Sequence, residues 1–250
     1  VFREYQINFN QWVDGNSEFD VYSKGGNINA HGTFLNNWRT GGGIGLNASG
    51  LSISELRGGP AIYKPSNINI WYNIHSDFRK PVSFGAFASV FHNEDDVESV
   101  SFGPEISYRA FDNLQISVET EYSKFSDTWA WRGIGLDSNS DKHYIFSDLD
   151  QKTLSMEMRA DYTVTTNLSI QFYGQALFTA GEYTNFRETD QVRAASFNER
   201  FSELENAITD LDVNGNDVLD IYNDQSEYYT FEDGIWTDFN YKEFRTNLVI

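Results

Sequence analysis

The chain has 250 residues, of which 40% are hydrophobic and 16% aromatic, and its 37 acidic and 18 basic side chains give a formal net charge of −19. This acidity argues against nucleic acid as a partner, because phosphates require a basic surface. The sequence contains no cysteine, which excludes disulfides, thiolate catalysis and cysteine-based zinc sites.

Apolar and polar residues alternate along much of the N-terminal half, which predicts β-strands because successive side chains of a strand point to opposite faces. The first predicted strand covers 2–13, where Tyr5, Ile7 and Phe9 share one face. Further strands are predicted at 19–21, 28–34, 42–48, 67–74 and 82–90. Proline cannot donate to a sheet ladder, so the segment 51–66, with its Gly58-Gly59-Pro60, is expected to be a loop or an irregular strand entry.

The second half contains two long predicted hairpins. In the first, strands 102–110 and 114–124 are joined by Phe111-Asp112-Asn113, where Asp and Asn suit a tight turn. The second covers 152–179, and its arms of about ten residues match the ~9–11 residues that a tilted strand needs to cross a bilayer. We expect six apolar residues of this hairpin to face lipid: Leu154, Met156, Met158, Leu168, Ile170 and Phe172. We expect four polar ones to face a lumen: Glu157, Arg159, Gln171 and Gln175.

The predicted connections differ in length. Those at 111–113 and 164–167 are short, the one at 92–99 is longer, and the one at 181–238 is the longest. Outer-membrane barrels combine short periplasmic turns with long external loops, and their strands need no continuous apolar run. The predicted fold is therefore all-β, an antiparallel up-and-down transmembrane β-barrel, with 1–250 in one domain and 182–238 as a long external loop. A soluble β-sandwich produces the same alternation and is the alternative.

Three stretches carry a resemblance to a known family: Leu56-Arg57-Gly58-Gly59-Pro60, 149–175 and 238–250. They are similar to the C-terminal β-barrel domain of unknown function of Bacteroidota envelope proteins, in which a domain like carbohydrate-binding module family 9 precedes the barrel. The resemblance implies an outer-membrane barrel and supplies no catalytic residues. The chain ends at Ile250 within an alternating segment, so we expect a fragment that lacks the upstream domain and the C-terminal strands of the barrel.

The acidic segment after residue 209 follows part of the pattern of a calcium loop. Four residues match positions one, three, five and six of an EF-hand loop: Asp210, Asp212, Asn214 and Gly215. Position twelve is Ile221 instead of a bidentate glutamate, so Asp217 or Asp220 would have to complete the site. A solvated acidic surface loop is the alternative explanation of the same residues.

Other candidate groups are weaker. Trp129 and Trp131 point to the same side of an extended segment, where aromatic rings could contact sugars or lie at a membrane interface. Glu119 and Glu121 share a strand face. Such a pair of carboxylates is compatible with acid–base catalysis on sugars, but also with an ordinary polar barrel interior. The run Gly41–Gly45 is explained better by a closely packed strand than by a phosphate loop. The four histidines follow no zinc motif: His31, His75, His92 and His143.

We therefore expect a non-enzymatic β-barrel of the bacterial outer membrane that acts as an envelope anchor or conduit and takes part in glycan or macromolecule handling within a larger assembly. The expected partners are outer-membrane lipid, an envelope protein at 182–238, and glycan. The only cofactor that the sequence suggests is calcium. The alternatives are a soluble or surface β-sandwich that binds glycan and, with less support, a polysaccharide hydrolase.

Overall fold

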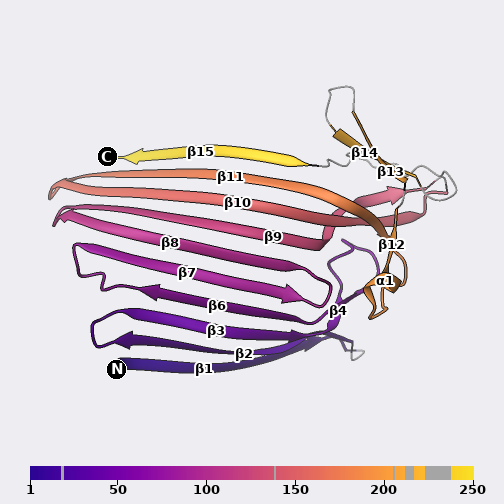
Figure 1. Cartoon of the computed structure of the whole chain (residues 1–250), viewed down its shortest axis with the longest axis horizontal. Helices are drawn as coiled ribbons and strands as arrows, with labels where there is room; N and C mark the ends of the chain where they lie inside the picture. Colours follow the sequence, from indigo (N-terminus) through magenta and orange to yellow (C-terminus); the bar gives the residue numbers. More distant parts are fainter. Residues whose placement is uncertain (18–19, 138, 205, 212–216, 223–237) are drawn as a thin grey trace.

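The computed structural model describes residues 1–17, 20–137, 139–204, 206–211, 217–222 and 238–250. The described residues form one large antiparallel sheet of eleven strands, and consecutive strands are neighbours throughout most of it (Figure 1). The strand order is β1-β2-β3-β6-β7-β8-β9-β10-β11-β12, and β15 pairs with β11 as well. The all-β, antiparallel part of the predicted fold is therefore confirmed.

The first half of the sheet follows the predicted alternation closely. Its strands are β1 (Phe2–Gly15), β2 (Val21–Phe34), β3 (Arg39–Ala48), β6 (Asn67–His75), β7 (Val82–Asn93) and β8 (Glu98–Phe111). The strand β2 contains the whole predicted strand at 28–34 and, of the predicted strand at 19–21, only Val21. Phe19 lies outside the described residues. Alternation does not reveal this continuity, because Gly25 and Gly26 have no side chains to alternate, yet they pair with Trp12 and Gln11 of β1.

The strands of the second half are longer than predicted. They are β9 (Leu114–Leu136), β10 (Lys142–Thr165), β11 (Leu168–Thr189) and the shorter β15 (Phe239–Val249). Residues 182–189 therefore belong to β11, and the predicted loop at 182–238 begins later than the sequence indicated. The tight turns are as predicted, since only Asp112-Asn113 and Thr166-Asn167 separate the strands that they join.

The irregular segments gather at one end of the sheet, and the chain termini lie at the other end, with the shorter turns (Figure 1). The irregular end holds the following small elements: β4 (Gly50–Ser52), β5 (Ile62–Lys64), α1 (Phe197–Arg200), β12 (Phe201–Glu203), β13 (Asn206–Leu211) and β14 (Asp217–Tyr222). The difference between the two ends comes mainly from two connections, 49–66 and 190–238. The segment 51–66 was predicted to be irregular, and it contains the short β4–β5 hairpin.

One turn at the other end is fixed by an ion pair. Asp77 accepts hydrogen bonds from the backbone N–H of Arg79 at 3.1 Å and from its guanidinium Nε at 2.9 Å and Nη2 at 2.7 Å. The guanidinium of Arg79 lowers the pKa of the Asp77 carboxyl to about 2. The carboxylate therefore stays ionised over the physiological range and holds the connection between β6 and β7.

The two faces of the sheet differ in chemistry, and their burial is inverted relative to a water-soluble sheet. One cross-strand row is apolar and exposed on five strands: Ile28, Ile44, Ile70, Val90 and Val100, with exposed fractions of 43–53%. The adjacent row on the opposite face is half-buried and largely polar: Asn29, Gly43, Trp71, Ser89 and Ser101. We call these the apolar face and the polar face.

The predicted hairpin at 152–179 obeys the same division. Phe172 lies opposite Ala160 and Ile170 lies opposite Tyr162, which places both on the apolar face with Met156. Gln175 lies opposite Glu157 on the polar face. The predicted separation of these residues into two faces is confirmed, whereas their contact with lipid stays a prediction.

The hydrophobic core does not lie beneath the sheet. Its buried members are Leu56, Ile62, Phe146 and Phe201, and they lie at the end with the irregular segments. In the described residues β1 pairs only with β2, and β15 pairs only with β11, so the strands do not close into a barrel. Among these same residues, no helix is both long and apolar enough to span a membrane.

Candidate functional site

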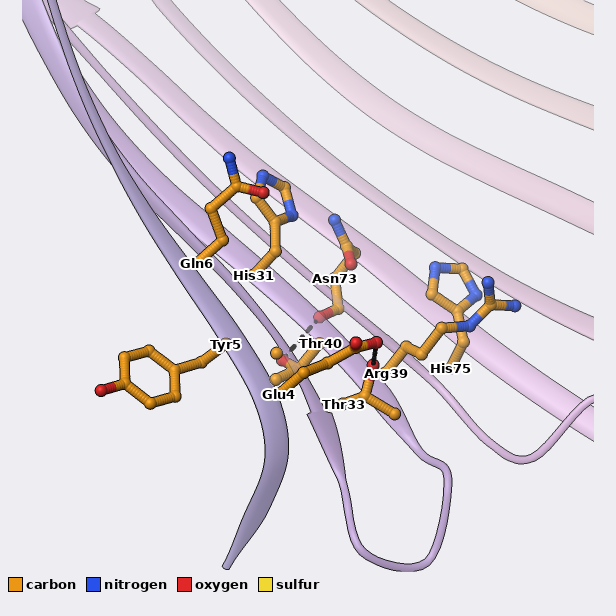
Figure 2. Close-up of a pocket in the computed structure, with 10 residues that line it drawn as sticks. Glu4, Tyr5, Gln6, His31, Thr33, Arg39, Thr40, Asn73 and His75 are labelled. Atoms are coloured by element: carbon orange, nitrogen blue, oxygen red, sulfur yellow. Dashed lines mark hydrogen bonds between the residues drawn. The ribbon is translucent and has the colours of Figure 1, made fainter.

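A hollow of the polar face lies over β1, β2, β3 and β6, and we call it the polar groove. Two adjacent cross-strand rows form it. The first row is Gln6, His31, Gly41 and Asn73, and the second row is Glu4, Thr33, Arg39 and His75. The groove has a volume of about 590 Å³, and Tyr5, Gly32 and Thr40 complete its lining. Figure 2 shows Gln6, His31 and Asn73 on the groove side of the strands, with Tyr5 pointing away.

Glycine on the polar face of β3 makes room for the neighbouring side chains of His31, Asn73 and Trp71. A Cβ atom at Gly41 would lie 2.6 Å from Nδ1 of His31 and 3.3 Å from Nδ2 of Asn73. One row along, a Cβ atom at Gly43 would lie 2.8 Å from Nε1 of Trp71. The rings of His31 and Trp71 lie close together, with centroids 5.6 Å apart. These distances confirm the prediction that the glycine run Gly41–Gly45 forms a closely packed strand.

Several polar side chains of the groove are held by neighbours. The carboxylate of Glu4 accepts a hydrogen bond from Oγ1 of Thr33 at 3.1 Å, and Nε2 of Gln6 donates to Asn8 at 2.7 Å. The hydroxyl of Thr40 donates to the backbone carbonyl of Asn73 at 2.9 Å. These bonds hold Glu4, Gln6 and Thr40 in place along the groove.

A row of carboxylates continues the polar face beyond the groove. Glu105, Glu119 and Glu157 lie opposite one another on β8, β9 and β10. Glu105 lies 2.8 Å from Nδ1 of His75, which links this row to the groove. Glu119 and Glu121 share this face of β9, as predicted, but both are exposed. Within the described part of the chain, no three His, Cys, Asp or Glu side chains form a group that could hold a metal ion.

Trp129 and Trp131 lie in the aromatic cluster at the irregular end of the sheet. Trp129 packs edge-on against Phe201 at 5.3 Å, and Trp131 packs edge-on against Phe146 at 5.3 Å. Both side chains are half-buried, and the guanidinium of Arg57 lies over the ring of Trp131. This packing gives both residues a structural role, and their contact with glycan stays a prediction.

The predicted calcium residues are described only in part. Asp212 and Asn214 lie outside the described residues. Asp210 lies in β13 opposite Val218, and Asp217 lies in β14 opposite Leu211. The candidate loop therefore connects two strands instead of the two helices of an EF-hand, and calcium binding stays a prediction.

Sequence reasoning missed the polar groove. Its residues come from four strands and follow no motif, because it is the register of the sheet that brings them together. One usable signal was present: Gly41 and Gly43 occupy alternate positions, so the glycine run had to leave space on one face of a strand.

Within its described residues, the chain is an all-β protein built on one antiparallel sheet of eleven strands that carries the polar groove on one face. The chain belongs to the family described as domain of unknown function (DUF5916), whose model matches residues 1–244. No curated protein and no solved structure shows significant similarity to the chain. The family match confirms the predicted membership of a family whose function is unknown. The other properties implied by the sequence resemblance stay predictions.

Proposed function

We propose that this chain forms part of the wall of a β-barrel in the bacterial outer membrane and serves as an envelope anchor or conduit, linked to the handling of glycans or macromolecules. The observation that carries this proposal is the inverted burial of the sheet. On β8, Val100, Phe102 and Ile106 are 51–52% exposed, while the alternate residues Ser101 and Glu105 are half-buried. The proposal assigns no chemical reaction to the chain.

Lipid is the environment that suits this inversion. Apolar side chains along a whole sheet would form an exposed patch far larger than soluble proteins usually tolerate. A bilayer covers such a face without any further protein, and a membrane barrel places its polar side chains inward. A sandwich would need a second sheet on the apolar face, and no second sheet covers that face among the described residues.

The free sheet edges set a condition on this proposal. Unpaired backbone N–H and C=O groups cannot be satisfied in hydrocarbon, so the outer edges of β1 and β15 must pair with further strands in the membrane. The irregular end, with the connections 49–66 and 190–238, would then face outward and meet a partner protein, while the short turns face the periplasm.

Single-cysteine labelling tests the proposal cleanly, because the chain contains no cysteine of its own. Met156→Cys places a thiol on the apolar face, and the neighbouring Ser155→Cys places one on the polar face. In lipid vesicles we expect the cysteine at 156 to escape a water-soluble maleimide and to be quenched by a lipid-borne spin label. We expect the cysteine at 155 to show the opposite behaviour.

Fractionation of intact cells accompanies the labelling, and the protein is expected with the outer membrane. Labelling of the cysteine at 156 by the water-soluble reagent, together with a protein that stays soluble without detergent, would refute the membrane proposal and favour the sandwich.

A further inference from the structure

The polar groove carries groups that are ready to bind a ligand. In the described part of the chain, the imidazole of His31 and the side-chain amide of Asn73 have no hydrogen-bond partner. The guanidinium of Arg39 makes no ion pair there and lies over the ring of Phe78, 4.7 Å from its centroid. A volume of about 590 Å³ lies within the usual range of small-molecule sites, about 300–1,000 Å³.

The charges of the groove disfavour ionic ligands. Glu4 supplies one negative charge and Arg39 one positive charge to the same lining. An anion would meet the carboxylate of Glu4 and a cation would meet the guanidinium of Arg39. Nδ1 of His75 lies 2.8 Å from the carboxylate of Glu105, so this ring nitrogen is already engaged. The lining therefore suits a ligand that carries no net charge.

The hydrogen-bonding groups of the groove suit neighbouring hydroxyls. A hydroxyl both donates and accepts, and amide, carboxylate and guanidinium groups can each contact two adjacent hydroxyls at once. Gln6, Asn73 and Arg39 provide such planar groups. The side chains of His31 and Asn73 lie over Gly41, which has no side chain to push them apart. The ring of His31 lies in the lining of the groove and packs against Trp71, with ring centroids 5.6 Å apart.

We propose that the polar groove binds a neutral hexose unit of a saccharide. This inference deepens the proposed function, because it names the solute that the polar face of the conduit would contact. It moves the glycan site away from Trp129 and Trp131 to side chains of β1, β2, β3 and β6.

The experiment uses the whole chain and isothermal titration with three neutral hexoses, D-glucose, D-galactose and D-mannose, and with D-glucuronate. Glucuronate differs from glucose only in carrying a carboxylate in place of the terminal CH₂OH. We expect millimolar binding of at least one neutral hexose and weaker binding of glucuronate. Asn73→Leu should weaken the binding of that hexose by about tenfold, because one amide is lost and its partner hydroxyls stay unpaired.

Asn69→Leu is the matched control. Asn69 lies on the same strand and the same face, does not line the groove, and undergoes the same chemical change. The affinity of the Asn69→Leu variant for the hexose should stay close to that of the original protein. Preferential binding of glucuronate, no binding of any neutral hexose at tens of millimolar, or equal losses in the two variants would each overturn the proposal.

The outcomes also separate this inference from the proposed function. Lipid protection of the cysteine at 156 without hexose binding would leave the membrane wall standing and remove the groove as a saccharide site. Asn73-dependent hexose binding by a protein that is soluble without detergent would keep the saccharide site and remove the membrane wall.

Discussion

At the scale of single residues, Arg200 is the most constrained side chain of the irregular end. It is completely buried, and its guanidinium forms an ion pair with the buried carboxylate of Asp95. Its Nη1 also donates to the carbonyls of Ala194 and Ala195 at 2.9 and 2.7 Å. The indole of Trp129 donates to the same Asp95 carboxylate at 2.9 Å. Arg200 therefore joins the segment after β11 to the β7–β8 connection and to β9.

Replacing Arg200 by methionine removes one partner of a buried ion pair, and the carboxylate of Asp95 loses its counter-charge. A change of this kind costs about 3–5 kcal/mol. We expect Arg200→Met to expose the irregular end to limited proteolysis and to lower the temperature at which that end unfolds. Arg193→Met, at an exposed position in the same segment, is the control and should behave like the original protein. Equal protection of both variants would show that the ion pair does not hold the segment.

At the scale of elements, the glycines of β3 set how closely the polar-face side chains of β2 and β6 approach each other. Gly43 and Gly45 occupy alternate positions on the same face of β3, but their surroundings differ. A Cβ atom at Gly43 would lie 2.9 Å from Cβ of Asn29 and 2.8 Å from Nε1 of Trp71. At Gly45, the nearest atom would be Cβ of Asn27 at 3.8 Å, an ordinary contact.

This difference predicts opposite results for one substitution at two sites. Gly43→Ala forces Trp71 or Asn29 to move, and overpacking of this kind costs about 1–3 kcal/mol. Gly45→Ala fits its space and should leave stability unchanged or raise it, because alanine restricts the unfolded chain. Thermal unfolding followed by tryptophan fluorescence measures both variants. A stable Gly43→Ala protein with an unchanged tryptophan spectrum would contradict the close packing.

At the scale of the whole molecule, the sheet has no core of its own. The buried hydrophobic cluster lies at the irregular end, while the apolar face carries exposed side chains on every long strand from β1 to β11 and on β15. A sheet of this kind is stable only if something covers that face, since burial of apolar surface is the main favourable term in folding. Under the proposed function, lipid provides this cover.

Arginine substitutions at two neighbouring residues of β8 test whether lipid covers the apolar face. In a bilayer, Ile106→Arg should lower the free energy of unfolding by about 2–4 kcal/mol, because it brings a charge into lipid near the middle of the strand. Ser107→Arg points to the polar face and should have a mild effect. Urea titration of vesicle-bound protein gives both values. A harmless Ile106→Arg combined with a costly Ser107→Arg would reverse the assignment of the two faces.

The all-β class, the position of most strands, the tight turns at Asp112-Asn113 and Thr166-Asn167, and the division of side chains between two faces follow from the sequence alone. They do so because strand periodicity and turn chemistry are local properties. The sequence did not reveal the parts of β9 and β10 that lie at the irregular end of the sheet. There Ile145 and Phe146 are adjacent and both buried, so the alternation of apolar and polar residues disappears. The polar groove and the contact of Arg200 with Asp95 become visible only in the folded protein. Both depend on which strands and loops become neighbours, and pairing between residues as distant as Gln6 and Asn73 leaves no local pattern in a single sequence.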